Sequence, residues 1–227
     1  MIRRSDTICF IPARGGSKGI KNKNLQKLKK KTLLEITIEL ALRSRIFNKI
    51  IVSSDSPKIL NIASKYKEIL VLKRSKKNSK DFSTTDEALV ECLKEINLNF
   101  ENIVILQVTS PLRRINTLKK FLDHCISRNI KTCCTVTKID ESISLDGTFY
   151  SPILKKIRRR QLRKKFMYEN GLIYFVKKKF FLQRKKIYPD NNWGYFETNR
   201  YESIDINNYD DLIISRLIYK KIQNDFD

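Results

Sequence analysis

Short apolar runs alternate with amphipathic stretches along the first 140 residues of this 227-residue chain. Five runs have the length and the β-branched content of buried strands: 7–11, 50–55, 69–72, 102–108 and 132–137. Hydrophobic spacing predicts four helices between them: 33–46 capped by Thr32, 58–66, 85–96, and a helix capped by Asn116 that runs to 127. Such alternation is typical of a mostly parallel sheet with helices on both faces. We therefore predict a doubly wound α/β fold in which residues 1–227 form a single domain.

The alternation stops after the fifth run. Residues 140–165 carry short apolar pieces, turns and the densest basic cluster of the chain, Lys155–Lys165. We predict that 140–165 leaves the sheet as an excursion suited to a substrate lid or a dimer contact. Further strands are predicted at 171–176 and 204–206, followed by a closing helix at 209–222.

The formal net charge of +23 raises the question of a nucleic-acid partner. However, the lysines are spread along the whole chain, in company with many isoleucines and asparagines. The cluster at 155–165 is explained at least as well as solvated surface beside a site for an anionic small molecule. Nucleic acid is therefore not expected as a partner, and nucleic-acid binding is kept only as a secondary alternative.

The sequence gives little indication of a membrane-spanning segment or of a zinc site. No apolar run approaches the roughly 20 residues that cross a bilayer, so no membrane partner is expected and the location is predicted to be cytoplasmic. The cysteines are odd in number, form no C-x-x-C pair and accompany a single histidine, His124. This usage argues against a zinc cage or a disulfide framework. We expect buried free thiols at Cys9, Cys92, Cys125, Cys133 and Cys134.

The first apolar run ends at Pro12 in a loop with three glycines, one arginine and three lysines. Glycine allows backbone N–H groups to approach an anion closely, and the cations neutralise its charge. In open α/β folds, a strand that runs into such a loop is where phosphates bind. Polar residues at 53–55, Arg74 and 107–113 are expected at the same edge of the sheet. They contain no evident nucleophile–base pair, which favours a transfer in which the substrate supplies the nucleophile.

Four segments in chain order resemble motifs of the CMP-N-acylneuraminate cytidylyltransferases, also called CMP-sialic acid synthetases. They are Ile11–Ile20 with Lys23–Leu25, then Leu106–Arg113, Glu169–Tyr174 and Ser203–Ile206. One glycine loop alone is a weak signal, whereas four ordered motifs over almost the whole chain are a strong one. The resemblance implies a Rossmann-like nucleotidyltransferase fold. It also implies a reaction in which CTP and a nine-carbon 2-keto acid sugar give a CMP-sugar and pyrophosphate.

The resemblance assigns the phosphate end of the nucleotide site. It implies that Arg14 and Lys23 are the catalytic cations that neutralise phosphate charge. The backbone N–H groups of Gly15, Gly16 and Ser17 are expected to line the phosphates.

The nucleoside end is assigned in the same way. The resemblance places Asn24 near the nucleotide, with a plain turn asparagine as the alternative. It assigns cytosine selection to Ala13, Arg74 and Thr85. Because Arg74 lies in a lysine-rich stretch, the alternative is that Arg74 is an ordinary surface arginine.

For the sugar, the resemblance implies contacts at Gln107, Arg160, Gln161, Asn170 and Gly171. An arginine suits the sugar carboxylate through bidentate hydrogen bonds, although Arg160 has two arginine neighbours that compete for the role. Gln107 ends a predicted buried strand, where a polar side chain is costly without partners. A structural hydrogen bond to the next loop is the alternative for Gln107.

The chain departs from the family at the late acidic motif. The family commonly shows two aspartates spaced i, i+2, whose carboxylates lie on one side of an extended segment and hold a divalent ion. Here the metal pair is Asp205 and Asn207. An amide oxygen coordinates Mg²⁺ without adding charge, so we expect Mg²⁺ to bind with CTP through Asp205. The resemblance thereby implies that Asp205 is catalytic together with Arg14 and Lys23. Asp210 and Asp211 offer compensation, although aspartates at a helix start usually stabilise the helix dipole.

The resemblance also implies a homodimer, with 140–165 at the interface. Three alternatives stay open beside the sialic-acid reading. They are a cytidylyltransferase for 3-deoxy-octulosonate, a transferase that uses another nucleotide, and an inactive relative suggested by Asn207. The residues do not decide between N-acetylneuraminic, legionaminic and pseudaminic acid.

Overall fold

The computed structural model describes residues 6–16, 19–79, 82–139, 143–145, 148–150, 166–188 and 193–221. Its central sheet is built from β1 (Thr7–Pro12), β4 (Lys49–Ser54), β5 (Ile69–Lys73), β6 (Asn102–Ile105), β7 (Thr132–Ile139), β10 (Phe166–Lys177) and β11 (Gly194–Glu197). The helices are α1 (Leu33–Ser44), α2 (Pro57–Ala63), α3 (Thr85–Glu95), α4 (Ile115–Ser127), α5 (Lys178–Arg184) and α6 (Tyr209–Lys221), with short 3₁₀ turns η2 (Lys23–Leu25) and η3 (Lys77–Ser79). Two small sheets pair β2 (Lys27–Leu28) with β3 (Lys31–Thr32), and β8 (Ile143–Leu145) with β9 (Thr148–Tyr150).

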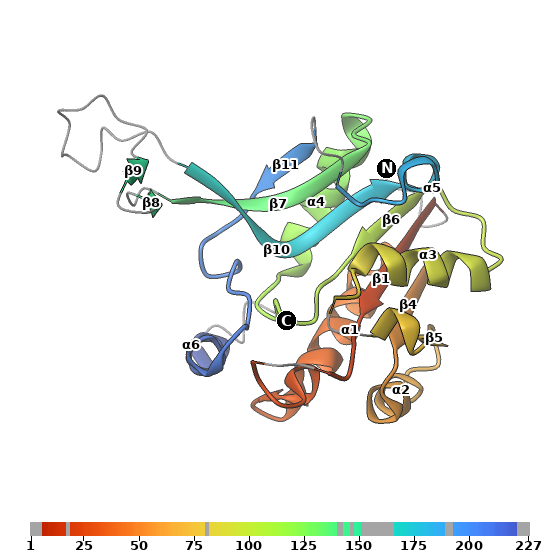
Figure 1. The fold of residues 1–227 in the computed structure, drawn as a ribbon, viewed down its shortest axis with the longest axis horizontal. Helices are drawn as coiled ribbons and strands as arrows, with labels where there is room; N and C mark the ends of the chain where they lie inside the picture. Colours follow the sequence, from red (N-terminus) through yellow and green to blue (C-terminus); the bar gives the residue numbers. More distant parts are fainter. Residues whose placement is uncertain are drawn as a thin grey trace.

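The strands of the central sheet lie in the order β11-β7-β10-β6-β1-β4-β5 (Figure 1). β1 pairs in parallel with β4 and β6, and β4 pairs in parallel with β5. β10 runs antiparallel to both β6 and β7, whereas β11 is parallel to β7. The predicted α/β fold with a mostly parallel sheet is confirmed, and β10 is its reversed strand.

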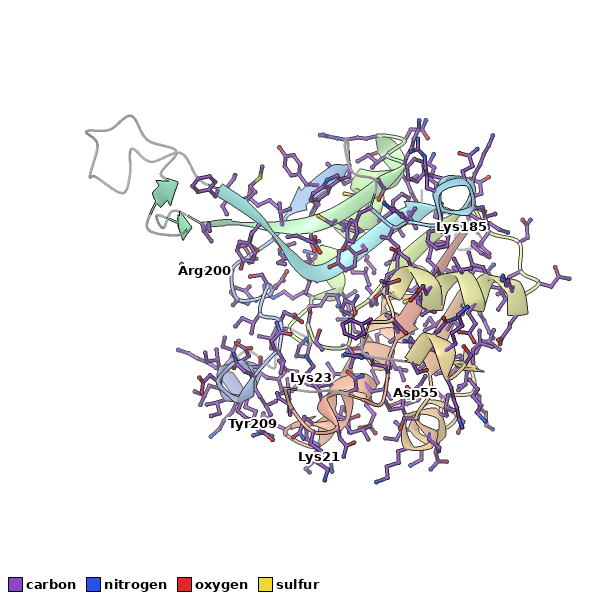
Figure 2. All side chains as sticks on the ribbon, in the orientation of Figure 1. Lys21, Lys23, Asp55, Lys185, Arg200 and Tyr209 are labelled. Carbon is purple, nitrogen blue, oxygen red and sulfur yellow. The ribbon has the colours of Figure 1, made fainter. Side chains whose placement is uncertain are left out.

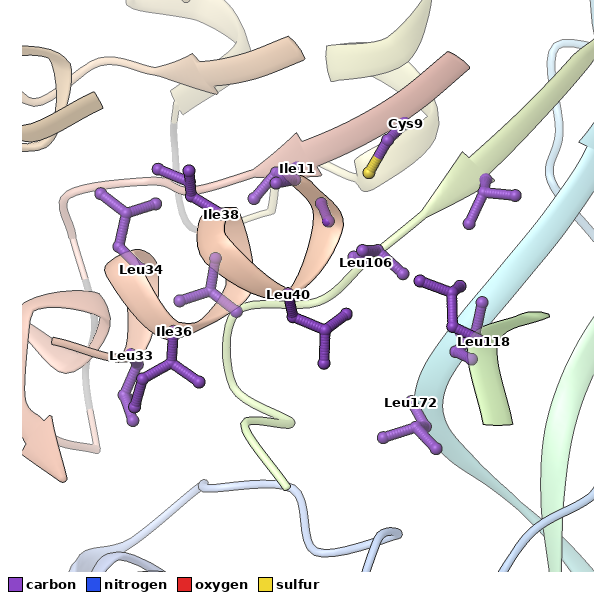
Figure 3. Packing of buried hydrophobic residues seen from close by; sticks show 14 of the residues in the cluster. Cys9, Ile11, Leu33, Leu34, Ile36, Ile38, Leu40, Leu106, Leu118 and Leu172 are labelled. Atoms are coloured by element: carbon purple, nitrogen blue, oxygen red, sulfur yellow. The ribbon is translucent and has the colours of Figure 1, made fainter. Parts of the chain in front are cut away.

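Both faces of the sheet are covered by helices. Along β1, Cys9 and Ile11 belong to the buried cluster that includes α1, α2 and α4. Ile8 and Phe10 belong to the cluster on the other face, with α3 and α5. Because successive side chains of a strand point to opposite faces, burial on both sides requires an unbroken apolar run. Figure 3 shows the first of these faces, where the apolar side of α1 packs beside β1.

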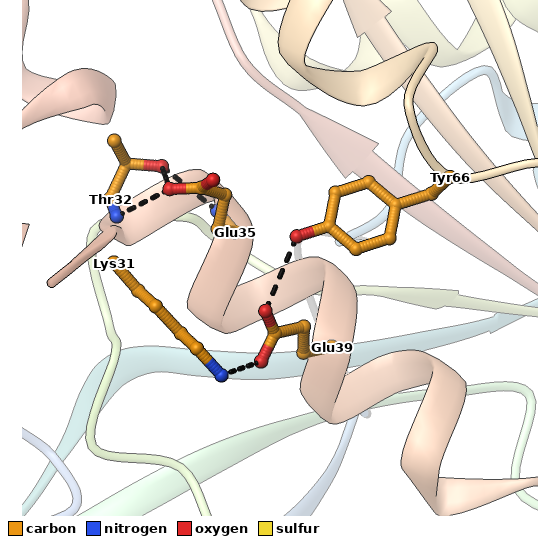
Figure 4. A network of polar contacts seen from close by, with 5 residues as sticks. All are labelled: Lys31, Thr32, Glu35, Glu39 and Tyr66. Atoms are coloured by element: carbon orange, nitrogen blue, oxygen red, sulfur yellow. Dashed lines mark hydrogen bonds and ion pairs between the residues drawn. The ribbon is translucent and has the colours of Figure 1, made fainter.

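Helix α1 begins at a reciprocal cap. Thr32 Oγ1 accepts a hydrogen bond from the Glu35 N–H at 3.1 Å, and Glu35 Oε2 accepts from the N–H and the hydroxyl of Thr32, each at 2.7 Å. Burial acts to raise the pKa of the Glu35 carboxyl, but the hydrogen bonds from Thr32, together with the charges of Lys65 and Lys27, lower that pKa overall. Glu39 pairs with Lys31 and accepts a hydrogen bond from the Tyr66 hydroxyl at 3.3 Å (Figure 4). The network joins α1 to β3 and to the turn after α2.

Two predicted strands are corrected. The strand predicted at 102–108 ends at Ile105, because the Gln107 carbonyl turns away and accepts hydrogen bonds from Arg113 and from the Ser110 N–H. Segment 204–206 is not a strand, since it docks through the Ile206 N–H on the Thr109 carbonyl (2.8 Å) without a ladder.

The start of one helix is also corrected. Helix α4 is capped by Arg114 and not by Asn116, because the first turn closes between the Leu118 N–H and the Arg114 carbonyl at 3.0 Å. Helix α5 and strand β11 were not predicted, and the closing helix is confirmed through Lys221.

Strands β8 and β9 form an antiparallel hairpin. Figure 1 shows this hairpin beyond the extended ends of β7 and β10. The remainder of the predicted 140–165 excursion, with Arg160 and Gln161, lies outside the described residues. The role of this segment in a dimer therefore stays a prediction.

The cysteine prediction is confirmed, since all five thiols are buried and free. Burial raises the pKa of Cys9 and Cys125, which keeps both sulfurs in the unreactive thiol form. No helix in the described part of the chain is long and apolar enough to cross a membrane.

We expect the substitution Thr32→Ala to lower the free energy of unfolding by about 1 kcal/mol, because it removes the hydroxyl that caps α1. Urea titration followed by circular dichroism measures the change. Ser56→Ala is the matched control, since Ser56 precedes α2 without making a side-chain cap bond. Equal losses in the two variants would contradict the capping role of Thr32.

Candidate functional site

A cleft of about 410 Å³ opens where β1, β5 and β6 end. This volume falls within the range of small-molecule sites, and the carboxyl ends of parallel strands are where α/β folds bind ligands. Its lining comes from the glycine-rich loop, the segment before α3, the loop after β6, and the late acidic segment. The lining residues are Pro12, Arg14, Gly19, Lys23, Asn24, Arg74, Phe82, Ser83, Thr84, Thr85, Gln107, Val108, Thr109 and Asn207.

The glycine-rich loop is held close to two other segments. The Gly15 N–H donates to Asp55 Oδ1 at 2.8 Å, and a Cβ at Gly15 would lie 2.8 Å from the Ser56 Cβ. A Cβ at Gly19 would lie only 2.4 Å from the Asn207 carbonyl oxygen. Glycine is therefore required at both positions by close approach.

Only two of the three backbone N–H groups that are predicted to line the phosphates belong to described residues. The Gly15 N–H, expected to face a phosphate, is engaged by Asp55. Gly16 is exposed, with nothing within 4 Å of the position of a Cβ. Ser17 lies outside the described residues. The phosphate role of these N–H groups stays a prediction.

Arg14 and Lys23 both line the cleft, as the sequence predicts. The buried Asn24 fixes the loop between them, since its Nδ2 donates to the Arg14 carbonyl at 2.9 Å. Lys23 Nζ donates to Asn207 Oδ1 at 3.4 Å. Burial lowers the pKa of Lys23, and the nearby Arg14 cation lowers it further, whereas Asp205 acts in the opposite direction.

Arg74 is anchored inside the protein and is not a surface arginine. Its side chain is 6% exposed, with Nε 3.3 Å from Ser53 Oγ and Nη2 3.2 Å from the Ser53 carbonyl. Burial lowers its pKa, while Asp55 acts to raise it. Thr85 lines the same cleft, but Ala13 is fully buried behind it and donates its N–H to the Ser53 carbonyl at 2.9 Å.

The late acidic segment forms a small polar network beside the cleft. Asp205 Oδ2 accepts a hydrogen bond from Asn207 Nδ2 at 2.9 Å, and Asp205 Oδ1 accepts from the Ser110 hydroxyl at 3.4 Å. Asp211 Oδ2 accepts from the N–H groups of Asn207 and Asn208, at 2.8 and 3.0 Å. Asp211 therefore stabilises the entrance to α6, as the helix-dipole reading predicts.

Gln107 lines the cleft, and its backbone is held by Arg113. The Arg113 side chain is 1% exposed, and its Nη2 donates to the Gln107 carbonyl at 3.0 Å. Arg113 Nε and Nη2 also donate to the Leu172 carbonyl on β10, at 2.9 and 2.5 Å. Burial lowers the pKa of Arg113 to about 10. Even so, its guanidinium stays charged at neutral pH and joins the loop after β6 to the reversed strand.

The predicted sugar contacts Asn170 and Gly171 do not line the cleft. Asn170 Oδ1 accepts from the Thr135 hydroxyl at 2.7 Å, and its Nδ2 donates to the hydroxyls of Thr137 and Thr198, each at 2.8 Å. Gly171 has a φ of +70°, which favours glycine, where β10 slips its register against β7. Both residues shape β10 next to the site, and their contact with a sugar stays a prediction.

Several lining residues were not predicted. They are Phe82, Ser83 and Thr84, which line the cleft just before α3. The run of hydroxyl residues at 83–85 was a usable signal, because it immediately precedes a predicted helix at the carboxyl edge of the sheet.

Arg14, Lys23 and Arg74 give the cleft a cationic lining at the carboxyl ends of parallel strands, the edge of the sheet where α/β folds bind ligands. The cytidylyltransferase family matches residues 8–220, and the chain belongs to that family. The resemblance to the CMP-N-acylneuraminate cytidylyltransferases is thereby confirmed, and the relatives below bear it out.

Two relatives show how far the sequence similarity extends. An N-acylneuraminate cytidylyltransferase of Streptococcus agalactiae is 32% identical over 215 residues, covering 91% of this chain and 51% of the relative. A pseudaminic acid cytidylyltransferase of Campylobacter jejuni is 30% identical over 229 residues, covering 94% of this chain and 96% of the relative. The chain thus spans about half the length of the streptococcal protein.

The fold is also that of a CMP:2-keto-3-deoxy-manno-octonic acid synthetase solved in complex with CTP. The TM-score is 0.72 at 17% identity, and the alignment covers 96% of this chain and 99% of that one. This likeness confirms the Rossmann-like nucleotidyltransferase fold.

The substitution Gly19→Ala is expected to destabilise the protein by about 1–3 kcal/mol, because the new methyl group would press against the Asn207 carbonyl. Gly16→Ala is the control, since its methyl group meets open space. Scanning calorimetry compares the two melting temperatures, and a Gly19→Ala variant as stable as the control would refute the close packing of the two segments.

Proposed function

We propose that this cleft binds CTP and transfers its cytidylyl group to a nine-carbon acidic sugar of the sialic acid type. The observation that carries the proposal is the meeting of Arg14, Lys23 and Asn207 with Arg74 and Thr85 in one cleft (Figure 2 labels Lys23 among the side chains). The two cations and the amide of Asn207 suit a triphosphate, whereas Arg74 and Thr85 suit a nucleoside. The names of the two relatives support CTP as the donor and a sugar of this class as the acceptor.

In the proposed reaction, the anomeric hydroxyl of the sugar attacks the α-phosphate of CTP. A bond forms between that oxygen and the α-phosphorus, the bond to the β-phosphate oxygen breaks, pyrophosphate leaves, and the hydroxyl proton passes to solvent. Among the described residues that line the cleft there is no histidine, cysteine or carboxylate. The chain therefore acts by position and charge, with Arg14 and Lys23 stabilising negative charge on the phosphates.

Magnesium belongs to the proposal as the companion of CTP. The described residues contain no cluster of three or more histidine, cysteine or acidic side chains that would hold a metal alone. One carboxylate, Asp205, lies beside the amide of Asn207, and Mg²⁺ in nucleotide sites commonly uses one or two carboxylates together with phosphate oxygens. The donors fit such a shared site, where Mg²⁺ would neutralise the charge of the phosphates.

The assembly and location extend the proposal beyond the reaction itself. A homodimer with contacts in 140–165 is supported by the hairpin of β8 and β9, which extends beyond the central sheet (Figure 1). A cytoplasmic location is supported by the dependence of the reaction on CTP.

Release of pyrophosphate from CTP tests the function. We expect turnover with at least one of N-acetylneuraminic, legionaminic and pseudaminic acid, and its loss in EDTA. Arg14→Ala should lower kcat/KM at least 100-fold, because a cation at the phosphates is lost. Arg128→Ala, at an exposed position just after α4, is the control. Turnover with 3-deoxy-octulosonate alone, or with no sugar of the panel, would overturn the sialic-acid assignment.

The pH profile tests the role of Lys23. Burial lowers the pKa of this ammonium, so it loses its charge as pH rises, at a pH below the ordinary value of 10.5. We expect kcat/KM for CTP to fall on the alkaline side as the charge disappears. Lys23→Arg should move this fall to higher pH, since guanidinium stays protonated. An alkaline limb at the same pH in both proteins would show that another group titrates.

A further inference from the structure

Glu202 is a fully buried carboxylate that the proposed reaction does not use. Its exposed fraction is 0%, and it lies between β11 and α6 in a segment without helix or strand, three residues before Asp205. Burial raises the pKa of Glu202, whereas the Thr117 hydroxyl and the Arg114 charge act to lower it. Its Oε2 has no hydrogen-bond partner among the described residues, so the carboxylate is incompletely compensated. A carboxylate is costly to bury unless it is paired, so the contacts that Glu202 does make indicate its role.

The contacts of Glu202 are with the first turn of α4. Its Oε1 accepts a hydrogen bond from the Thr117 hydroxyl at 3.0 Å and forms an ion pair with Arg114 Nε at 3.4 Å. Arg114 is the residue that caps α4, and its guanidinium carbon also lies 4.8 Å from the centre of the Tyr201 ring. The first turn of α4 has no acidic residue of its own, so Glu202 supplies the negative charge that a helix N-terminus favours. Residues 201–202 are thus fastened to the start of α4.

A second attachment lies on the other side of Asp205. The Ile206 N–H donates to the Thr109 carbonyl at 2.8 Å, in the loop that leads from β6 to α4. Asp205 stands between the two attachments, and its Oδ1 accepts a hydrogen bond from the Ser110 hydroxyl of the same loop at 3.4 Å. Residues 107–109 of this loop line the cleft. The acidic segment is therefore held before and after Asp205 by one continuous stretch of chain, which runs from the cleft lining into α4.

We propose that Glu202 is a positioning residue, which holds Asp205 beside the cleft at the place where Mg²⁺ is shared with the phosphates of CTP. The inference rests on the proposed function and adds to it the side chain that keeps this carboxylate in place. Glu202 acts through the chain, since only Ser203 and Ile204 separate it from Asp205. A buried ion pair often contributes little net stability, and its best supported use is to fix one arrangement of the parts that it joins. Replacement of residues that orient a metal ligand typically lowers metal affinity about 10- to 100-fold.

Calorimetric binding of CTP without sugar, in Mg²⁺ and in EDTA, separates the metal from the rest of the site. We expect Glu202→Ala to raise the Kd for CTP about tenfold in Mg²⁺ and to leave the Kd in EDTA unchanged, because the cations of the cleft stay in place. Glu202→Gln keeps an oxygen for the Thr117 hydroxyl but loses the charge that pairs with Arg114, so its effect should be smaller. Thr117→Val removes the hydroxyl and leaves the carboxylate. It should shift the Kd in Mg²⁺ in the same direction, and it supplies the test if Glu202→Ala does not fold.

A double-mutant cycle shows whether Glu202 works through Asp205. Asp205→Asn removes the carboxylate that is positioned, so the addition of Glu202→Ala should produce no further rise in the Kd in Mg²⁺. Two independent structural losses would instead add. The matched control is Glu197→Gln, which takes an exposed carboxylate from β11 and breaks its ion pair with Lys138. This control should leave both Kd values unchanged.

The outcomes distinguish this inference from the function on which it rests. If the unsubstituted protein binds CTP neither in Mg²⁺ nor in EDTA, the proposed function falls. If it binds CTP equally well in both, the magnesium part of that function falls and takes the inference with it, before any substitution is made. If binding depends on Mg²⁺ but Glu202→Ala changes neither Kd, or raises both equally, positioning by Glu202 is overturned. Additive losses in the cycle with Asp205→Asn would overturn it as well.

Discussion

The buried guanidinium of Arg113 is the interaction on which the site depends. It bridges the Gln107 carbonyl after β6 and the Leu172 carbonyl on β10. Hydrogen bonds from a charged donor are stronger than neutral ones. Removal of Arg113 would take two charged donors from the Leu172 carbonyl and leave the Gln107 carbonyl with only the Ser110 N–H of its two donors in the described part of the protein. The loop that Arg113 holds also supplies Ser110, which contacts Asp205. One side chain thus joins the parallel half of the sheet, the reversed strand and the acidic segment.

The cleft concentrates positive charge at a cost in free energy. Burial lowers the pKa of both Lys23 and Arg74, which means that the folded protein disfavours their charged forms. Asp205 and Asp55 offset only part of this effect, since both pKa values stay lowered. A bound polyanion would supply the missing compensation. The same electrostatics that disfavour these charges in the free protein therefore favour an anionic ligand in the cleft.

The asparagine in the late acidic motif changes how this segment works. Asn207 donates to Asp205 and accepts from Lys23, so its amide links a carboxylate to an ammonium. An aspartate at this position would accept from Lys23 but would offer no donor to Asp205. The amide of Asn207 thus links Asp205 to Lys23, and the segment carries one negative charge fewer than it would with an aspartate at this position. The single carboxylate of Asp205 is consistent with a metal that shares its ligands with the phosphates of a nucleotide.

The sequence by itself determined the alternation of elements, because two-sided burial demands the apolar run of β1. It also determined the glycines and cations of the first loop, from which phosphate binding is predicted. Those are local requirements, so residue type and position were enough to place Arg14, Lys23 and Arg74 at the carboxyl edge of the sheet, whereas their roles were implied by the family resemblance. Only the tertiary structure decided that β10 is reversed, that Gly19 must clear the Asn207 carbonyl, and that Phe82 joins the cleft. It also decided that the side-chain amide of Asn170 forms hydrogen bonds with three threonine hydroxyls. Each of these features is a contact between segments far apart in the chain, and residue type and spacing contain no record of which segments meet.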